Sequence, residues 1–524
     1  MTKRPISKAF IILSLFAILL LGFSTSGFST IYYVNTASTG TGDGTTQEIT
    51  GEHAAWKTIV EINNFYASLN PGDNIYFNRG NTWSEGQALK IRASGSAGGG
   101  YITFGAYGTG AKPILINASG SYSTIYGYSS SVQYIHIDNL ELRGDTGVAG
   151  TGGINFSQDD GGHIWISDCD INTFGSNVSG ISFSKIDTYI IEDCTIVDAP
   201  HIGIYIKGSE LYKICDGLIQ NNDVSGSGNS DNISFHDDSS TNNIGNNHIV
   251  QDNKFYDGAE DGIDTGFTGT VTGLVFRGNE TYNNGNIGIS VNGSGAIVEQ
   301  NYVHDEGKKG IYVSQNASDC EIRYNIVDNC TECCFSTATS AGTPTNINIY
   351  NNIFKEGALD TRSIITISSQ STPDGLEFKN NIILAEVQHG VWYVGTNTPT
   401  NTNSVWNNNC FYDSGGDTTF FTVDETDYNF TDWKSTWTQD ANSIFTDPLM
   451  TDPANDNFKL NPHSPCVNAG TDVSLTEDYE GNAVPQGSAP DIGAYEYGEL
   501  GETIIINPIL KIIINPIIIK PIIK

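Results

Sequence analysis

Short alternations of apolar and polar residues recur along the middle of the chain, and residues 251–314 contain three copies of one unit. Each copy opens on an apolar alternation, reaches an Asn, turns through Gly and polar residues, and closes on a second alternation. The three asparagines are Asn253, Asn279 and Asn301. No i, i+3, i+4 apolar spacing accompanies them, so the pattern predicts repeated β-strands rather than helices.

The same unit extends in both directions with a period that drifts through the twenties, which is typical of a β-solenoid. Leucine-rich repeats have a similar period, but they need a Leu framework that this chain lacks. We therefore predict an all-β chain folded as a single-stranded parallel β-helix, with one period per coil. The predicted anchor positions are Asn139, Asp168, Cys194, Asp223, Asn253, Asn279, Asn301, Asn325, Asn352, Asn381 and Asn409.

Stacked coils lie about 4.8 Å apart, so equivalent residues of neighbouring coils become neighbours in space. The predicted inward column contains Ile233, Ile263, Ile289 and Ile311. The predicted outward column beside it contains Ser234, Asp264, Ser290 and Tyr312. In the turn before these columns, acidic residues face a lysine pair about 10 Å further along. These residues are Asp231, Glu260 and Asp261, against Lys308 and Lys309.

The two ends of the chain differ from the coils. Residues 1–30 have the three parts of a secretory signal, namely cations, an apolar run from Ala9 to Phe23, and small residues. We expect an exported protein, secreted or at the cell surface, with an uncleaved N-terminal anchor as the alternative. Residues 501–524 are apolar, but prolines and Lys511 make a membrane span unfavourable. An attachment tail and a gene-end artefact both remain open for this segment.

Residues 31–117 contain the first coils and one segment with helical spacing, in which Ile59, Ile62 and Phe65 lie on one face. We predict that this helix covers the open end of the solenoid, because an uncovered sheet edge invites aggregation. The main β-helix is expected over residues 118–440. Residues 441–500 are rich in Pro and Gly and are expected to fold back along the last coils as a closing module.

The formal net charge of −34 narrows the possible partners. Nucleic acids and anionic membranes bind through cationic patches, so neither is expected. A polyanionic glycan would also be repelled unless a divalent cation reversed the local field. Nine cysteines are scattered along the chain, and no His or second Cys pair supports zinc at Cys330, Cys333 and Cys334. Core packing or local disulfides account for them instead, and we expect a monomer.

Segments near both ends of the coils resemble one group of bacterial proteins. The N-terminal stretches YYVNTASTGTGDGT, LNPGDNIYFNRG and GAYGTGAKPIL, and the later stretch DPLMTDPANDNFKLNPHSPCVNAGTD, are similar to those of secreted, pectate-lyase-like β-helix proteins. The resemblance spans residues 31–497 and implies a right-handed parallel β-helix with an N-terminal helical cap. It is weak for activity, since this group includes lyases, hydrolases, epimerases and surface proteins without known activity.

The run Glu260-Asp261-Gly262-Ile263-Asp264 resembles the calcium-binding D-D-G-x-D motif of the family-9 pectate lyases. The resemblance implies that Glu260, Asp261 and Asp264 are calcium ligands, and that Asp231 on the preceding coil is a fourth. Calcium takes six to eight oxygen ligands in flexible geometry, which these carboxylates with amide groups and water would supply. Ca²⁺ is therefore the expected cofactor, and an extracellular polysaccharide the expected partner.

In that family a lysine one coil further on removes a proton during β-elimination. Here Ser290 occupies the matching position, so the general base is predicted to be Lys308 or Lys309, with His304 on the same coil. A solvated turn is the alternative role for the lysine pair. The predicted substrate-binding residues are His236, Asp237, Asp238, Asn286 and Asn292.

Two other function classes remain. A glycoside hydrolase would use a carboxylate pair such as Asp237 and Asp264, and it would suit a neutral sugar. A non-catalytic surface protein would use calcium to hold the coils together. The favoured prediction is a calcium-dependent polysaccharide lyase that acts on uronate sugars.

Overall fold

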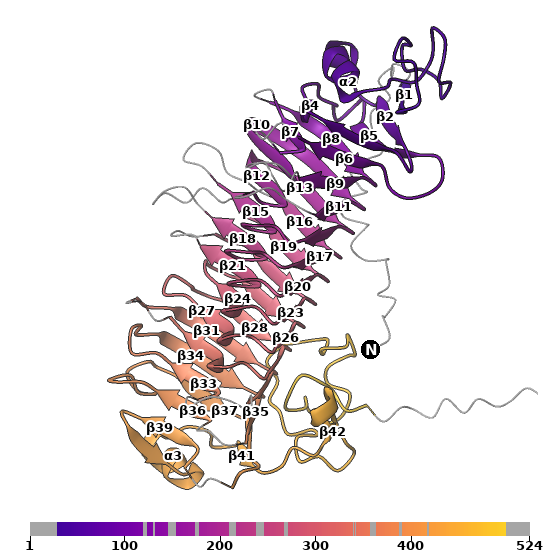
Figure 1. Ribbon diagram of the computed structural model, residues 1–524. Helices are drawn as coiled ribbons and strands as arrows, with labels where there is room; N and C mark the ends of the chain where they lie inside the picture. The colour runs from indigo at the N-terminus through magenta and orange to yellow at the C-terminus, as the bar shows by residue number, and fades with distance from the viewer. Residues whose placement is uncertain are drawn as a thin grey trace, which may run out of the picture.

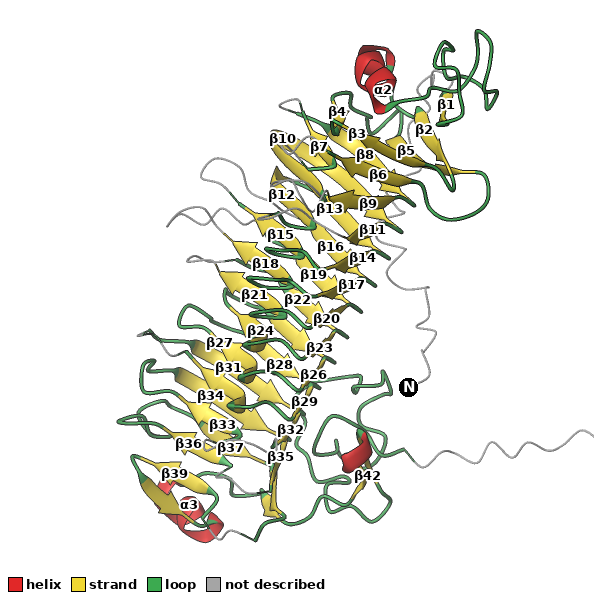
Figure 2. Ribbon diagram, in the orientation of Figure 1, coloured by secondary structure: helices red, strands yellow, loops and turns green. Residues whose placement is uncertain are grey.

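The computed structural model describes residues 29–118, 123–128, 131–144, 153–172, 178–208, 216–236, 246–266, 271–338, 340, 342–356, 363–386, 390–416 and 419–498. Within this part of the chain, the backbone winds into an elongated parallel β-solenoid (Figure 1). Every coil contributes strands to three faces, which we call faces A, B and C. Figure 2 shows that strands make up nearly all of the long body and that helices lie at its ends.

Face A contains β1 (Ile31–Val34), β2 (Asn74–Asn78), β5 (Ile102–Tyr107), β8 (Gln133–Asp138), the end of β10 (Ile154–Ser167), β13 (Tyr189–Glu192), β16 (Gly217–Gln220), β19 (His248–Gln251), β22 (Val275–Arg277), β25 (Ile297–Glu299), β28 (Glu321–Arg323), β31 (Thr345–Tyr350), β34 (Asp374–Lys379) and β37 (Val405–Asn407). Face B contains β3 (Thr82–Glu85), β6 (Ile114–Asn117), β9 (Glu141–Gly144), β11 (Asp170–Asn172), β14 (Thr195–Val197), β17 (Asp223–Ser225), β20 (Lys254–Tyr256), β23 (Glu280–Tyr282), β26 (Tyr302–His304), β29 (Ile326–Asp328), β32 (Ile353–Lys355), β35 (Ile382–Ala385), β38 (Cys410–Asp413) and β41 (Ile444–Phe445).

Face C contains β4 (Leu89–Ile91), β7 (Ile125–Gly127), the start of β10, β12 (Ile181–Ile186), β15 (Ile204–Lys207), β18 (Ile233–His236), β21 (Ile263–Gly266), β24 (Ile287–Val291), β27 (Lys309–Val313), β30 (Cys333–Thr337), β33 (Ile365–Ile367), β36 (Val391–Tyr393), β39 (Phe421–Val423) and β40 (Thr426–Tyr428). Because β10 runs through faces C and A, these two faces form one continuous sheet. All pairings within the three faces are parallel except that of β39 with β40.

The register confirms the predicted inward column, since Ile263 pairs with Ile233 on one side and with Ile289 on the other. Ile289 in turn pairs with Ile311. All four side chains are fully buried in one hydrophobic core that runs along the solenoid. This repeated burial of branched aliphatic side chains explains why the alternation in the sequence is so regular.

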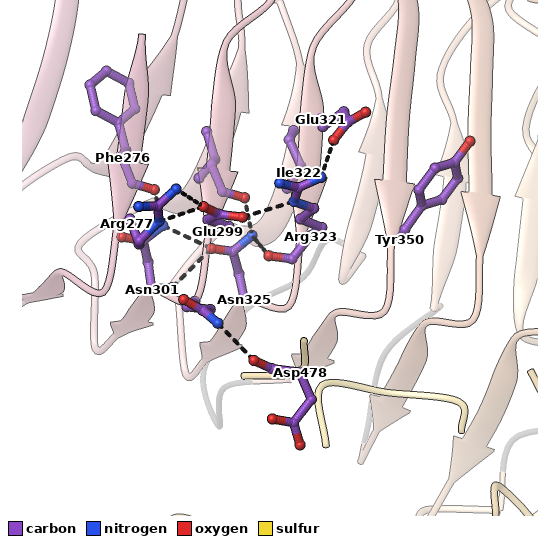
Figure 3. A network of polar contacts seen from close by, with 12 residues as sticks. Phe276, Arg277, Glu299, Asn301, Glu321, Ile322, Arg323, Asn325, Tyr350 and Asp478 are labelled. Atoms are coloured by element: carbon purple, nitrogen blue, oxygen red, sulfur yellow. Dashed lines mark hydrogen bonds and ion pairs between the residues drawn. The ribbon is translucent and has the colours of Figure 1, made fainter. Parts of the chain in front are cut away.

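Between faces A and B, a column of buried asparagines connects successive coils. The Asn279 amide donates to Oδ1 of Asn301 at 3.0 Å and to the Val250 carbonyl at 2.9 Å, and its own oxygen accepts from Asn253. The preceding residue is often left-handed, as Asp252 is with φ of 57°, a conformation that favours Gly, Asn and Asp. Figure 3 shows Asn301 and Asn325 of this column. Its members are Asn222, Asn253, Asn279, Asn301, Asn325, Asn352, Asn381 and Asn409.

Three of the predicted anchors were wrong by one residue. Asp223 pairs with Lys254, so Asn222 occupies the column position of Asn253. By the same register, the column positions on the two earlier coils are occupied by Leu140 and Cys169, and not by Asn139 and Asp168 as predicted. Asn139 and Asp168 are the left-handed corner residues just before these positions, with φ of 58° and 47°.

The predicted helix near the N-terminus is confirmed as α2 (Ile59–Phe65), followed by the 3-10 turn η1 (Tyr66–Ser68). Thr58 and Glu61 form a capping box at its start. Asn63 donates to the Ala88 carbonyl and accepts from the Lys90 N–H, both at 2.9 Å. These are edge groups of β4, the first strand of face C, so α2 supplies the hydrogen bonds that a further strand would make.

At the other end, α3 (Phe430–Trp437) packs against the last coils, an element that the sequence analysis missed. Trp433 is fully buried and stacks on Phe421 with 4.5 Å between ring centroids. Residues 443–498 then return along the solenoid, with η2 (Pro453–Asn455) and the hairpin of β42 (Met450–Asp452) and β43 (Asn457–Leu460). Gln300 donates to the Asp478 carbonyl at 2.7 Å, a contact drawn in Figure 3.

The predicted signal and the apolar tail lie outside the described residues, as do Cys215, Asp237 and Asp238. Within the described ranges, no helix has the length and apolar character needed to cross a membrane. The eight cysteines in those ranges are buried and have free thiols.

Candidate functional site

The predicted acidic residues lie at the start of two neighbouring strands on face C. β18 and β21 pair in register, which places Ser234 beside Asp264 in the outward column. Because Ile263 pairs with Ile289 and Ser290 with Tyr312, the column continues as predicted. Along face C its members are Lys90, Tyr126, Asn155, Ser182, Tyr205, Ser234, Asp264, Ser290, Tyr312, Ser336, Thr366, Trp392 and Thr422.

Asp261 is buried and is bonded to the coils on both sides. Its Oδ1 accepts from the Asn286 amide at 2.7 Å and from the Ile287 N–H at 3.1 Å. Its own N–H donates to Oδ1 of Asp231 at 3.1 Å. The structure therefore brings Asp231, Asp261 and Asn286 together. These residues lie on three successive coils that stack in register.

Asp264 lies on β21, where it accepts a hydrogen bond of 3.3 Å from the Ser234 hydroxyl. Asp231 accepts from Ser230 at 3.2 Å. Glu260 is exposed in the turn before β21, and its charge acts on both Asp231 and Asp264. The four predicted metal ligands therefore form one group, which we call the carboxylate cluster: Asp231, Glu260, Asp261 and Asp264.

Burial and mutual repulsion both favour the protonated forms of these acids. The pKa of Asp261 is raised to about 8, first by burial and then by the charges of Asp264 and Asp231. The pKa of Asp264 is raised to about 7 by burial and by Asp231. The pKa of Asp231 is raised as well, mainly by burial. Among the residues that the structure describes, no cationic side chain is a leading influence on the pKa values of these three groups.

The carboxylate cluster fits a calcium ion in its chemistry, since it offers hard oxygen donors and excess negative charge. Within the described residues, however, no group of three or more His, Cys, Asp or Glu side chains is already arranged around a metal position. Three carboxylates with uncompensated repulsion on adjacent coils would be stabilised by a divalent cation. Side-chain rotation would be needed to direct them to one point.

The predicted bases lie further along face C. Lys309 pairs with Ile287, and so it lies two coils beyond Asp261 in the same column. Its ammonium group is 3.8 Å from Glu332 and 4.9 Å from the centre of the Tyr312 ring. Lys308 is exposed in the preceding turn. Lys309 is thus on face C, as expected, and its ion pair joins it to Glu332 on the next coil.

His304 does not join this group. It lies on β26 of face B, where its ring stacks between Tyr282, at 5.0 Å, and Tyr302, at 4.2 Å. It also pairs with Asp305 at 2.8 Å and with Glu280 at 3.6 Å. The structure therefore separates His304 from the lysines by placing its strand on another face of the same coil.

Of the predicted substrate-binding residues, the structure describes His236, Asn286 and Asn292, which lie on or beside strands of face C. His236 is exposed at the end of β18, 6.4 Å from the Tyr205 ring. Asn292 is buried just after β24 and accepts from the Gly293 N–H. Ser290 is also buried, one coil beyond Asp264. A serine here offers a hydroxyl but no group with the basicity of a lysine.

Glu306 is among the buried acids that the sequence analysis did not single out. Glu306 has no exposed surface, and its carboxylate accepts from the Asn284 N–H at 2.9 Å and from the Asn284 amide at 3.2 Å. Burial raises its pKa to about 8. The repeat alignment could have predicted this position, because it places Glu306 opposite Asn284 of the preceding coil. Glu306 lies in the same corner between faces B and C as Asp231, Glu260 and Asp261, but on the coil of β26 and β27, two coils beyond Asp261.

Comparisons with known proteins agree with this architecture. A family model described as a right-handed β-helix region matches residues 245–411. No curated protein matches the sequence. Among solved structures, a mannuronic acid-specific family 6 polysaccharide lyase from human gut microbiota is similar over 76% of this chain and 92% of its own, with 13% identity and a TM-score of 0.51.

Two further solved structures cover more of the chain at lower structural similarity. The complex of XylC with xylose matches 90% of this chain and 99% of its own, with 11% identity and a TM-score of 0.49. Pectate lyase Pel9A matches 90% and 98%, with 13% identity and a TM-score of 0.40. At such identities the likeness concerns the fold. The strand register shows a parallel β-helix, and the model that matches residues 245–411 is that of a right-handed β-helix region.

Proposed function

We propose that this protein is an exported polysaccharide-active β-helix protein that binds its glycan along face C and cleaves it as a calcium-dependent uronate lyase. The observation that carries the proposal is the carboxylate cluster, in which burial and the neighbouring carboxylates raise the pKa values of Asp261 and Asp264, and no cation of the described residues is a leading influence on them. The outward column through Asp264 also presents hydroxyl, amide and aromatic groups, which are suited to sugars.

When bound, a divalent cation supplies positive charge that acidifies the sugar proton beside a uronate carboxylate. The carboxylate cluster would hold that ion, and Asn286 would keep Asp261 in place. Lys309 or Lys308 would then remove the proton, the electron pair left behind would form the double bond as the glycosidic C–O bond breaks, and the departing sugar oxygen would take a proton from water. Lys309 is the better placed, because it lies in the Asp261 column and is partly buried.

The test is the ultraviolet absorbance of the new double bond while the protein meets a panel of uronate glycans, with calcium and with chelator. Calcium-dependent absorbance that Lys309→Met abolishes and Lys308→Met spares would support the proposal and identify the base. No absorbance with any uronate glycan would reject lyase activity.

A second candidate is a glycoside hydrolase, favoured by the pKa of about 7 for Asp264. A carboxyl group that titrates near neutral pH is suited to general acid catalysis. Its partner was predicted to be Asp237, which lies outside the described residues. New reducing ends without new absorbance, insensitive to chelator, would identify this activity. Calcium-dependent melting without any turnover would instead identify a non-catalytic surface protein.

A further inference from the structure

A cluster of cations and aromatic rings lies at the N-terminal end of face C, far from the carboxylate cluster. Lys90 on β4 pairs in register with Tyr126 on β7, and Tyr128 follows β7 directly. Tyr66 of η1, next to the capping helix, reaches the same place. We call Tyr66, Lys90, Arg92 and Tyr128 the cation–aromatic patch.

The rings in this patch hold the two cations. The Arg92 guanidinium lies 4.0 Å from the centre of the Tyr128 ring and 5.0 Å from that of Tyr66. The Lys90 ammonium lies 5.2 Å from the Tyr128 centre. Tyr128 is 50% exposed and Tyr66 is 38% exposed, so the patch is open to solvent. The geometry is that of cation–π contacts, which position a cation beside a ring.

An aromatic partner differs from a carboxylate because it leaves the positive charge in place. The chain has 59 acidic and 25 basic residues, and many of its cations are in ion pairs, such as Lys254 with Glu280 and Arg323 with Glu299. In the part of the chain that the structure describes, Lys90 has no such ion pair. A ring quadrupole attracts a cation without neutralising it, so the Lys90 ammonium keeps its positive charge beside Tyr128 on an acidic protein.

The patch also lies on the path of a glycan along face C. Lys90 belongs to the outward column that contains Asp264, and six strand steps separate them, through β7, β10, β12, β15 and β18 to β21. At about 4.8 Å per step the separation is about 29 Å, a span of several sugar units. A chain lying along this column would meet both groups.

We propose that the cation–aromatic patch is a remote anchoring site for an acidic sugar unit of the polysaccharide on face C, an inference that rests on the proposed function. Lys90 and Arg92 would pair with the sugar carboxylate through charge-assisted hydrogen bonds. Tyr66 and Tyr128 would hold the cations in position and offer their hydroxyl groups to the sugar. The patch needs no metal, in contrast to the carboxylate cluster.

The test measures the binding of a galacturonate oligomer of about ten units, long enough to reach from Lys90 to Asp264, a distance of about 29 Å. Calorimetry is carried out in chelator, so that binding is separated from calcium-dependent turnover. The combined Lys90→Gln and Arg92→Gln variant is expected to bind roughly tenfold or more weakly than the parent chain. Tyr128→Leu, which removes the ring that holds both cations, is expected to weaken binding as well.

Lys434→Gln is the matched control, because Lys434 also lies over a ring, that of Phe430 at 5.0 Å, but on α3 at the far end. It should leave binding unchanged, and unchanged melting temperatures would show that all variants fold. Equal binding by parent and double variant would overturn the proposal, as would equally tight binding of a neutral galactan oligomer. Calcium-dependent turnover that persists in the double variant would then show that the proposed function survives without the patch.

Discussion

The side-chain amide of Asn286 donates a hydrogen bond of 2.7 Å to Oδ1 of Asp261 and ties this acid to the next coil. The Ile287 N–H donates to the same oxygen at 3.1 Å. Both bonds favour the ionised carboxylate, yet burial and the neighbouring charges of Asp264 and Asp231 outweigh them. Asp261 is therefore held in place by groups that do not balance its charge.

In chelator, the free energy of unfolding is expected to fall as pH rises from about 4 to about 8. The pKa of Asp261 is about 8 in the folded protein and about 3.9 in an unfolded chain, so in this range the folded state holds a proton that the unfolded state has lost. Asp261→Asn should flatten this dependence. Thermal unfolding of both proteins across the range measures it, and equal slopes would contradict the assignment.

Calcium is expected to raise the Tm of the protein, and Asp264→Asn to remove most of that rise. An ion that binds only the folded state at a hundred times its Kd adds about 2.7 kcal/mol of stability. Asp257→Asn is the matched control, because Asp257 is an exposed corner residue of the same coil with φ of 53°, and Asn tolerates that conformation. Identical calcium responses in both variants would exclude Asp264 as a ligand.

Asn279→Ala is expected to lower the free energy of unfolding by roughly 2–4 kcal/mol. The substitution leaves the Val250 carbonyl and the Asn253 amide without their buried partners. The exposed corner residue Asn283, with φ of 55°, provides the control Asn283→Gly, which should change stability little. Denaturant unfolding monitored by circular dichroism compares the two, and similar losses would refute a special contribution of the asparagine column.

Cys410 and Cys466 are expected to form a disulfide when the protein is exposed to oxidised glutathione. Cys410 lies on β38 and Cys466 in the closing module, both are buried in one apolar cluster, and the adjacent Cys466 thiol is the first cause of the raised pKa of Cys410. A cross-link over a loop of this length stabilises by about 4 kcal/mol. Peptide mapping without reduction detects the bond, and Cys410→Ser should abolish the effect of oxidant on Tm.

Other partners for either cysteine in the peptide map would contradict this pairing. Cys169 and Cys194 are a useful internal comparison, because they are neighbours in one column of the core and also lie side by side. All four side chains are buried, but Cys466 belongs to the closing module that folds back on the coils, so the Cys410–Cys466 pair is expected to be oxidised faster than the pair within the solenoid.

The sequence alone was sufficient to predict the coils, because a parallel β-helix repeats one local pattern and stacks it at a constant spacing. The inward column from Ile233 to Ile311 and the neighbourhood of Asp231 and Asp261 followed from alignment without any coordinates. Alignment failed at Asp223 and Asp168, since ladder and corner positions both favour Asn and Asp. The backbone distinguishes the two positions, because the corner residue is left-handed, as Asp168 is with φ of 47°.

Tertiary structure decided whatever depends on which face of a coil a side chain occupies. His304 precedes Lys309 by five residues, yet a corner between them places it on face B in a stack with Tyr282. Asp261 is bonded to Asp231 of the coil before it and to Asn286 of the coil after it, and no single repeat contains that information. Two further contacts join segments that are distant in the sequence. Asn63 bonds to the edge of β4, and Trp433 packs beneath the last coil. A local pattern determines strand and turn, whereas charge, burial and partners arise from stacking.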